Sequence, residues 1–214
     1  KEDIEIAGFL AASLAWGQRP TIIKKCKELM QLMDYAPHDF VMQAEAQDYE
    51  RFCNFKHRTF NSYDCVYFLR SLANIYRHHG GLETVFTRAY QKHQDMFEVL
   101  KEWYSVFPSL PAEARVLRHI ANVEKGSAAK RVNMFLRWMV RHDHSGIDFG
   151  LWKGIPASAL LIPLDLHTGH VSRELGLLTR KQNDAKAVEE LTRRLREFDP
   201  VDPIRYDFAL FGLG

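Results

Sequence analysis

Apolar residues recur along almost the whole chain three and four positions apart, which is the spacing of one helix face, and this pattern constrains the fold more than any other feature. Strand-like alternation of apolar and polar residues is scarce. We therefore predict an all-α protein. The expected helices cover residues 4–16, 21–33, 40–52, 62–76, 81–90, 96–107, 113–122, 128–140, 168–175, 184–198 and 206–213.

The length and composition fit a globular protein. A chain of 214 residues with 46% hydrophobic content buries a sizeable core and forms one large or two small domains. No apolar run approaches the roughly 20 residues of a membrane span, and the first residues, Lys1 to Glu5, are too charged for a signal peptide. We expect a cytoplasmic protein without a membrane partner, associated with the nucleoid if its source is bacterial.

A polar loop at residues 142–148 predicts a domain boundary. Residues 1–141 would form a barrel-like helical domain, and residues 142–214 a second helical domain that carries Asp165 and the C-terminal helix. We expect a cleft between the two helical subdomains.

Residues 115–140 have the outline of a helix-hairpin-helix motif, with Gly126 in the turn and Ser127 as the expected N-cap of the second helix. Backbone N–H groups in such a hairpin hold phosphates. Seven Lys and Arg residues against the single acid Glu124 lie between residues 115 and 141, so the segment predicts a surface for nucleic acid. The alternative is a solvated helix face that happens to be basic. The expected contacts to a phosphate backbone are Lys125, Gly126, Ser127 and Arg131.

Two residues with reactive side chains stand at the beginnings of predicted helices. Lys130 lies in the opening turn of an amphipathic helix, and Asp165, 35 residues later, lies in the Pro-led segment that opens another. A lysine attacks carbon only as the free amine, and a helix N-terminus, the neighbouring Arg131 and partial burial each disfavour the ammonium. The pair predicts amine-nucleophile chemistry assisted by a carboxylate. The alternatives are a phosphate-neutralising lysine and a simple N-cap aspartate.

The residues around these two positions resemble a known superfamily. The segment Ala129-Lys130-Arg-Val-Asn-Met-Phe-Leu resembles the hairpin-lysine segment of the helix-hairpin-helix DNA glycosylases, the superfamily of endonuclease III and the 8-oxoguanine glycosylase/lyases. The segment Pro163-Leu-Asp165-Leu-His167-x-x-x-Val171-x-Arg173 resembles that superfamily's Pro-Val-Asp-x-His segment and the helix that follows it.

The resemblance implies a bifunctional DNA N-glycosylase and AP lyase of base-excision repair. Lys130 would attack C1′ of a flipped nucleotide and form a Schiff base, and Asp165 would assist its activation and stabilise oxocarbenium-like charge. β-Elimination at the abasic site would follow. The expected substrate is an oxidised purine, 8-oxoguanine above all, and the expected partner of the monomeric protein is damaged double-stranded DNA.

Other segments extend the resemblance thinly over most of the chain. Residues 11–18 resemble the early helix whose final glutamine intrudes at the lesion, and residues 206–211 resemble the terminal helix that lines the base pocket of the 8-oxoguanine enzymes. The candidates for stacking on an extruded base, or for hydrogen bonding to it, are Trp16, Gln18, Trp152, Asp207 and Phe211. Each aromatic is alternatively a core residue. His167 and His170 are candidates for phosphate contacts or for hydrogen bonds behind the site.

The chain also departs from the superfamily pattern. Its interval between lysine and aspartate is about twice the usual one because residues 143–155 are inserted, and this longer interval resembles that of the archaeal 8-oxoguanine branch. The chain as a whole also resembles an uncharacterised bacterial family of the same general plan. The three cysteines, Cys26, Cys53 and Cys65, lack the four-cysteine cluster of endonuclease III, so no iron–sulfur cofactor is implied. No side-chain cluster predicts a metal site, and the only cation expected is a monovalent one at the hairpin carbonyls.

Two other functions fit parts of the sequence. An all-α metal phosphohydrolase of the His-Asp type would use His142 and Asp143 together with His119 and either Asp148 or Asp207. A non-catalytic helix-hairpin-helix module would bind nucleic acid through the hairpin and use no nucleophile.

Overall fold

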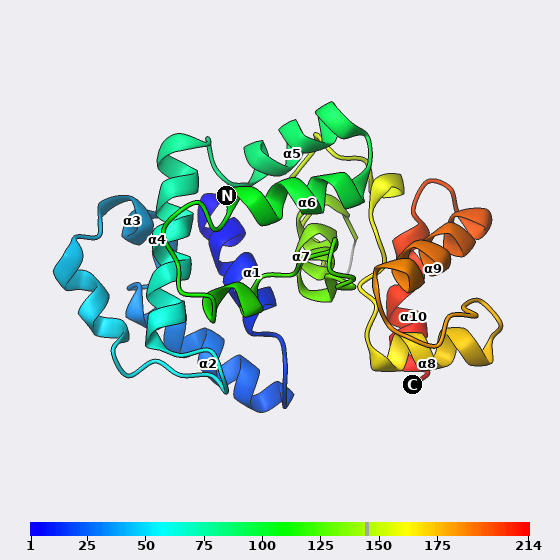
Figure 1. The fold of residues 1–214 in the computed structure, drawn as a ribbon, viewed down its shortest axis with the longest axis horizontal. Helices are drawn as coiled ribbons and strands as arrows, with labels where there is room; N and C mark the ends of the chain where they lie inside the picture. Colours follow the sequence, from blue (N-terminus) through cyan, green and yellow to red (C-terminus); the bar gives the residue numbers. More distant parts are fainter. Residues whose placement is uncertain (144–145) are drawn as a thin grey trace. The chain divides into compact units, whose positions relative to one another are not determined.

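The computed structural model describes residues 1–143 and 146–214, and within these ranges the chain is helical, with no β-strand (Figure 1). The all-α prediction is therefore confirmed. None of the described helices combines the length and the apolar character that crossing a lipid bilayer requires. In chain order the α-helices are α1 (Glu2–Leu14), α2 (Arg19–Leu32), α3 (Pro37–Gln43), α4 (Ser62–His78), α5 (Leu82–His93), α6 (Met96–Val106), α7 (Lys130–Val140), α8 (Leu166–Glu174), α9 (Ala185–Phe198) and α10 (Asp207–Gly212), and the 3-10 helices are η1 (Ala46–Phe52), η2 (Val116–His119), η3 (Ala157–Ala159) and η4 (Pro203–Tyr206).

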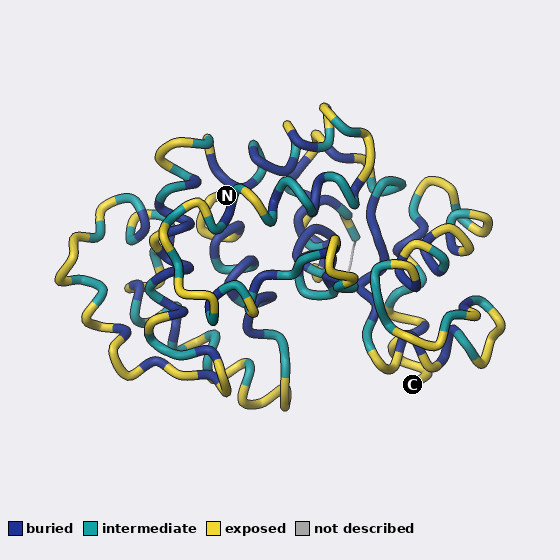
Figure 2. The backbone as a smooth tube through the Cα atoms, in the orientation of Figure 1, coloured by how far each residue is buried: buried dark blue, intermediate teal, exposed yellow. Residues whose placement is uncertain are grey.

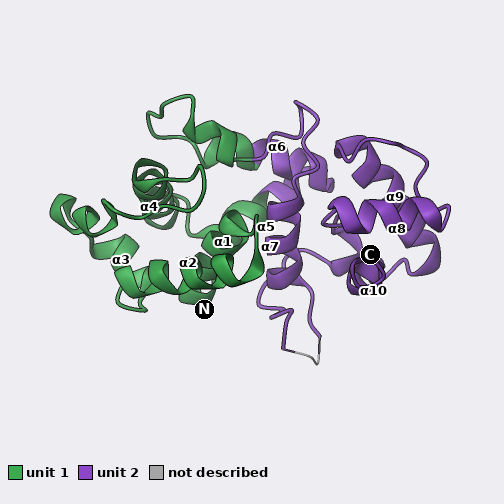
Figure 3. Ribbon diagram, turned by 90° about the horizontal axis from the view of Figure 1, so that it is seen from below, with its two compact units in different colours: residues 1–88, 103–120 green, residues 89–102, 121–214 purple. Residues whose placement is uncertain are grey.

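The chain divides into two compact units (Figure 3). Unit 1 contains residues 1–88 and 103–120, and unit 2 contains residues 89–102 and 121–214. The boundary predicted at residues 141/142 lies inside unit 2, because the loop that follows α7 folds back onto that helix. The N–H groups of Phe149 and Trp152 donate to the carbonyls of Trp138 and Met139, at 2.7 and 2.8 Å.

Unit 1 has an aromatic core. Phe9 of α1 stacks with Phe68 of α4 at a centroid distance of 6.2 Å and meets Trp103 edge-on at 5.3 Å. Phe107 contacts the same two phenylalanines at 5.1 and 5.0 Å. Figure 2 shows buried backbone along α1 and α4, where the apolar residues recur at helical spacing.

Unit 2 is organised around α7. Phe135 on the apolar face of this helix meets Trp152 edge-on at a centroid distance of 5.4 Å. The run from Leu160 to Leu164 is buried, and its Ile162 N–H donates to Oγ1 of Thr192 on α9 at 3.1 Å. This buried run leads directly into the turn that carries Asp165.

The prediction of an α-helix as the first arm of the helix-hairpin-helix motif is wrong. The structure has only the 3-10 helix η2 within the range 113–122 where an α-helix was predicted. Arg115 at the start of η2 donates to Asn61 at 3.0 Å and to Asp64 at 2.8 Å, and these long-range bonds fix the segment inside unit 1. Helix α7 belongs to unit 2, so the two arms of the predicted motif lie in different units.

The helix predicted over residues 40–52 is interrupted. Helix α3 ends at Gln43, and η1 begins at Ala46. Glu45 and Asp48 form a reciprocal capping box, in which each side chain accepts from the other residue's backbone N–H, and this box starts a new helical segment. The remaining predicted helices occur in the structure with ends that differ by a few residues.

Candidate active site

The turn before α7 places Lys130 at the first position of that helix, as predicted. Gly126 has a φ of +85°, and the Ser127 N–H donates back to the Asn122 carbonyl at 3.1 Å. The N-cap is Ala129, with a φ of +48°, and not Ser127. The Oγ of Ser127 instead accepts from the Ala129 N–H at 3.2 Å, so the serine stabilises the turn before the helix begins.

Asp165 is the N-cap of α8. Its Oδ1 accepts from the Thr168 N–H at 2.8 Å, so the interpretation of this residue as an N-cap is confirmed. Partial burial of the carboxyl raises its pKa, but the hydrogen bond from Thr168 and the ammonium of Lys130 outweigh that effect and lower the pKa of Asp165 below its ordinary value. Asp165 is therefore a carboxylate that stays ionised at neutral pH.

Lys130 and Asp165 lie in contact within unit 2. The Lys130 Nζ is 3.1 Å from the Asp165 Oδ2, and the lysine side chain is 37% exposed while the aspartate side chain is 12% exposed. An ion pair with one exposed partner contributes little to stability. The arrangement leaves the amine partly accessible to solvent and places it within hydrogen-bonding distance of a mostly buried carboxylate.

A network of buried charges lies farther along α7. Arg137, with a side chain 2% exposed, donates to Asp148 from Nε and Nη2, both at 3.1 Å, and also hydrogen-bonds to Asp207. Arg141, one helical turn later, donates to Asp148 at 2.6 Å and to Asp202 at 2.9 Å. The network joins α7 to the loop after it, to η4 and to α10.

Asp207, the first residue of α10, connects this network to the Lys130–Asp165 pair. Burial raises the pKa of Asp207 to about 6, although Arg137 and Lys130 act in the opposite direction, and the charge of Asp165 adds to the rise. The ring of Phe208 covers the Arg137 guanidinium at 3.9 Å. Asp165 and Asp207, two carboxyl groups whose pKa values are shifted in opposite directions, thus interact with each other and with Lys130.

We expect Asp207→Asn to change how stability depends on pH. A carboxyl with a pKa of about 6 in the folded chain and an ordinary value of 3.8 binds more protons when folded. Its stabilising contribution is fully present only below pH 4 and is lost as the pH rises through 6, so the wild type should lose roughly 2 kcal/mol relative to the variant between pH 4 and pH 7. Urea unfolding of both proteins across this range measures the difference, and a difference that does not vary with pH contradicts the expectation.

The predicted base-contacting residues divide into three groups. Asp207 and Phe211 both belong to α10, and the Phe211 ring, 51% exposed, meets His167 of α8 edge-on at 5.7 Å. Trp152 is 1% exposed and packs against Phe135, so it is a core residue of unit 2. The prediction of Trp152 as a stacking residue is corrected, because the loop after α7 folds it inward.

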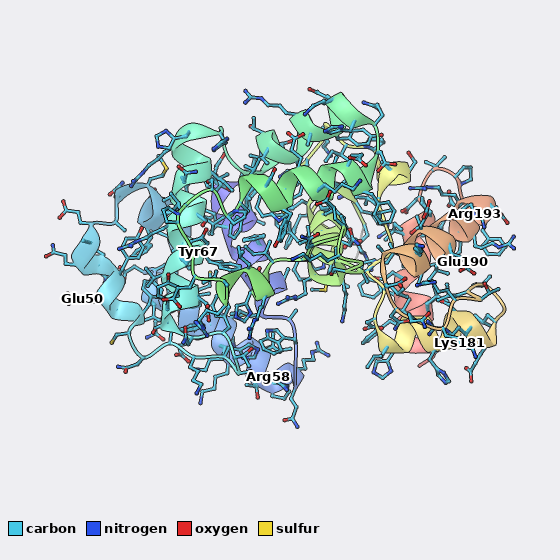
Figure 4. All side chains as sticks on the ribbon, in the orientation of Figure 1. Glu50, Arg58, Tyr67, Lys181, Glu190 and Arg193 are labelled. Atoms are coloured by element: carbon cyan, nitrogen blue, oxygen red, sulfur yellow. The ribbon has the colours of Figure 1, made fainter. Side chains whose placement is uncertain are left out.

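Trp16 and Gln18 lie in unit 1. The Trp16 ring packs against His57 at 5.6 Å and His119 at 6.4 Å, and the guanidinium of Arg58, labelled in Figure 4, lies 5.2 Å from its centre. Gln18 is exposed and is the N-cap of α2. They belong to a different unit from Lys130 and Asp165.

The predicted phosphate contacts differ in exposure. Lys125, Gly126, His167 and His170 are exposed, whereas Ser127 and Arg131 are half-buried. Burial lowers the pKa of the Arg131 guanidinium, and His170 Nε2 lies 3.3 Å from Glu174 on the same helix. The hairpin carbonyls of Asn122, Val123 and Gly126 accept hydrogen bonds from backbone N–H groups. The monovalent cation expected at these carbonyls stays a prediction.

Sequence reasoning did not assign a role to Arg137 or Arg141. A signal was present, because Arg137 lies between the apolar residues Leu136 and Met139 on the core face of an amphipathic helix. A charged residue there must find partners, but the sequence does not show which ones. The structure supplies Asp148 and Asp207 as those partners.

Four of the five candidate residues of the phosphohydrolase alternative, His119, Asp143, Asp148 and Asp207, form ion pairs. His119 pairs with Asp64 at 3.4 Å in unit 1, whereas Asp148 and Asp207 hold Arg137 in unit 2. Among the described residues, no group of three or more His, Cys, Asp and Glu side chains is arranged to hold a metal ion.

No curated protein and no solved structure matches the chain significantly. A family model does match, and it covers residues 1–214. Lys130, Asp165 and the buried network of α7 all lie within the matched range. The protein belongs to the family described as "Protein of unknown function (DUF2400)".

Proposed function

We propose that the protein is a DNA N-glycosylase with AP lyase activity that removes an oxidised purine from duplex DNA through a lysine Schiff base. The observation that carries the proposal is the 3.1 Å contact between the Lys130 Nζ and the Asp165 Oδ2 at the beginnings of two helices. The resemblance of both segments to the helix-hairpin-helix glycosylases supports the same chemistry. We place its action in the cytoplasm, as a monomer.

The proposed reaction begins with proton transfer. Asp165 takes the proton of the Lys130 ammonium transiently and passes it to the departing base or to water, so the carboxylate is ionised before and after the step, and the free amine attacks C1′ of an extruded nucleotide. The N-glycosidic bond breaks, and the base leaves with the bonding electrons and takes up a proton. Loss of a second proton from nitrogen and cleavage of the C1′–O4′ bond, with O4′ taking up a proton, open the sugar ring and give the protonated imine between Lys130 and C1′.

The lyase step follows on that imine. The imine acidifies the C2′ hydrogens, so loss of one C2′ proton expels the 3′ phosphate and breaks the strand. Hydrolysis of the imine then releases the sugar fragment and returns the lysine. Every step uses water and the groups of this chain and its substrate.

Residues of α10 are the proposed base contacts. Phe211 offers an exposed aromatic face, and Asp207 offers a carboxyl that is partly protonated near neutral pH because its pKa is about 6. In its protonated form this carboxyl both donates and accepts hydrogen bonds, and the polar edge of a purine presents acceptors and donors to match. Oxidised purine, with 8-oxoguanine the first to test, is therefore the proposed substrate class.

Borohydride trapping on a panel of lesions tests the proposal. Duplex oligonucleotides that carry 8-oxoguanine, an abasic site, uracil or no lesion are incubated with the protein and sodium borohydride, which reduces a Schiff base to a stable adduct. We expect an adduct with the abasic site and with 8-oxoguanine. The proposal is wrong if neither substrate gives an adduct, and salt-sensitive binding without an adduct would favour the non-catalytic module.

We expect Asp165→Asn to slow adduct formation by about 100-fold or more without unfolding the protein. Asparagine retains the N-cap but cannot take the proton from Lys130. Asp165→Ala removes both functions and should also lower the free energy of unfolding by about 1 kcal/mol.

The matched control is Asp95→Asn. Asp95 precedes α6 and caps it in the same way, accepting from the Glu98 N–H at 3.0 Å, whereas the ionic partner of Lys130 is Asp165. Single-turnover trapping rates and urea unfolding are measured for all three variants. Equal trapping by Asp165→Asn and the wild type would remove the carboxylate from the mechanism.

A further inference from the structure

The loop of residues 175–184 between α8 and α9 is held by polar contacts within the loop and to α9. Figure 4 labels Lys181 in this loop and Glu190 on α9. The Glu190 carboxylate accepts from both N–H and Oγ1 of Thr179, each at 2.6 Å. Arg180 forms an ion pair with Asp184 at the end of the loop. These bonds hold the loop close to α9.

Asn183 at the end of this loop contacts the turn that carries Asp165. Its Nδ2 donates to the backbone carbonyl of Asp165 at 2.8 Å, and its Oδ1 accepts from Arg173 of α8. The fit is close, because a Cβ added to Gly169 would lie 2.6 Å from the Asn183 Oδ1. Asn183 therefore packs against the first turn of α8.

The same end of the loop contacts the hairpin that carries Lys130. The N–H of Ala185, two residues after Asn183, donates to the carbonyl of Gly126 at 3.1 Å. Residues 183–185 thus hold the backbone of Asp165 through a side chain and the turn before Lys130 through the backbone. All of these residues belong to unit 2.

We propose that Asn183 is a positioning residue that sets the relative placement of Lys130 and Asp165. Its bond to the Asp165 carbonyl fixes the backbone from which the carboxylate projects, while the neighbouring bond to Gly126 fixes the hairpin. Loss of the first bond lets the carboxylate move relative to the amine. This inference rests on the proposed function, in which proton transfer between these groups starts the reaction.

The substitution Asn183→Asp distinguishes two roles of Asn183, which are the positioning of Asp165 relative to Lys130 and the anchoring of the loop. An aspartate at this position retains the contact with Arg173 and strengthens it by charge, but it presents only acceptors to the Asp165 carbonyl. The matched control is Gln182→Glu, which adds the same charge at the neighbouring exposed position. Asn183→Ala removes both contacts.

The expected result is a loss of rate without a loss of binding. Asn183→Asp should slow single-turnover trapping on abasic duplex DNA by about 100-fold, the order expected for a misplaced reacting group. Its Kd for the same duplex should match that of Gln182→Glu, its melting temperature should be lower by only about 2–4 °C because one hydrogen bond is lost, and Gln182→Glu should trap as the wild type does. If Asn183→Asp traps as fast as Gln182→Glu, Asn183 is only a loop anchor and the inference is overturned.

A second readout does not depend on catalysis. Reductive methylation with ¹³C-formaldehyde labels the lysines, and the signal of Lys130 is identified by its absence from Lys130→Gln. We expect Asn183→Asp to shift this signal in the absence of DNA and Gln182→Glu to leave it unchanged. Failure of the wild type to trap any substrate would overturn the proposed function, whereas an unshifted Lys130 signal in Asn183→Asp would overturn the positioning role alone.

Discussion

Replacement of Lys130 by arginine is expected to abolish covalent trapping while leaving the fold and DNA binding intact. Arginine retains the positive charge beside Asp165, but it cannot be deprotonated in a protein and forms no Schiff base. Removal of a catalytic nucleophile lowers the rate by several orders of magnitude, so we expect a loss of at least about a thousandfold. Lys130→Gln should show the same loss and should also bind duplex DNA more weakly, because it lacks the charge.

The control for this experiment is Lys125→Gln. Lys125 is an exposed hairpin lysine five residues before Lys130, and it lies outside the contact with Asp165. It should trap with the wild-type rate and bind DNA with a weaker salt dependence, because one phosphate contact is lost. Adduct formation by Lys130→Arg would show that another amine is the nucleophile, and the assignment of Lys130 would then fail.

Asp148→Ala is expected to be the most destabilising of the substitutions considered. The Asp148 side chain is fully buried, and it accepts three hydrogen bonds from Arg137 and Arg141. Its removal leaves the buried guanidinium of Arg137 with Asp207 alone. Breaking a buried ion pair by removing one partner costs about 3–5 kcal/mol, which is a large part of the stability of a typical domain.

Urea unfolding followed by circular dichroism measures this effect. The matched control is Glu197→Ala, which removes an exposed carboxylate that pairs with Arg194 at 3.1 Å on α9. An exposed pair of this kind contributes less than about 1 kcal/mol. If Asp148→Ala lowers the free energy of unfolding no more than Glu197→Ala does, the buried network does not hold unit 2 together.

Two failed predictions, the helix over residues 113–122 and the exposure of Trp152, have a common physical origin. The apolar periodicity of residues 113–122 favours a helix, but Arg115 is held by Asn61 and Asp64, which lie more than fifty residues earlier in the chain. Trp152 is a similar case, since nothing in its local sequence shows that the loop after α7 folds back to bury it against Phe135. Local patterns carry no information on such long-range partners.

The sequence by itself determined the helical class, the positions of most helices, and the choice of Lys130 and Asp165 as residues that begin two of them. These properties depend on spacing and capping within a few residues, which a linear sequence records directly. The tertiary structure alone decided the 3.1 Å contact between the two side chains, the burial of Asp207 that raises its pKa to about 6, and the ties from Asn183 and Ala185 to both turns. Each of these depends on packing between segments far apart in the chain, and burial and partner distance are set only when those segments meet.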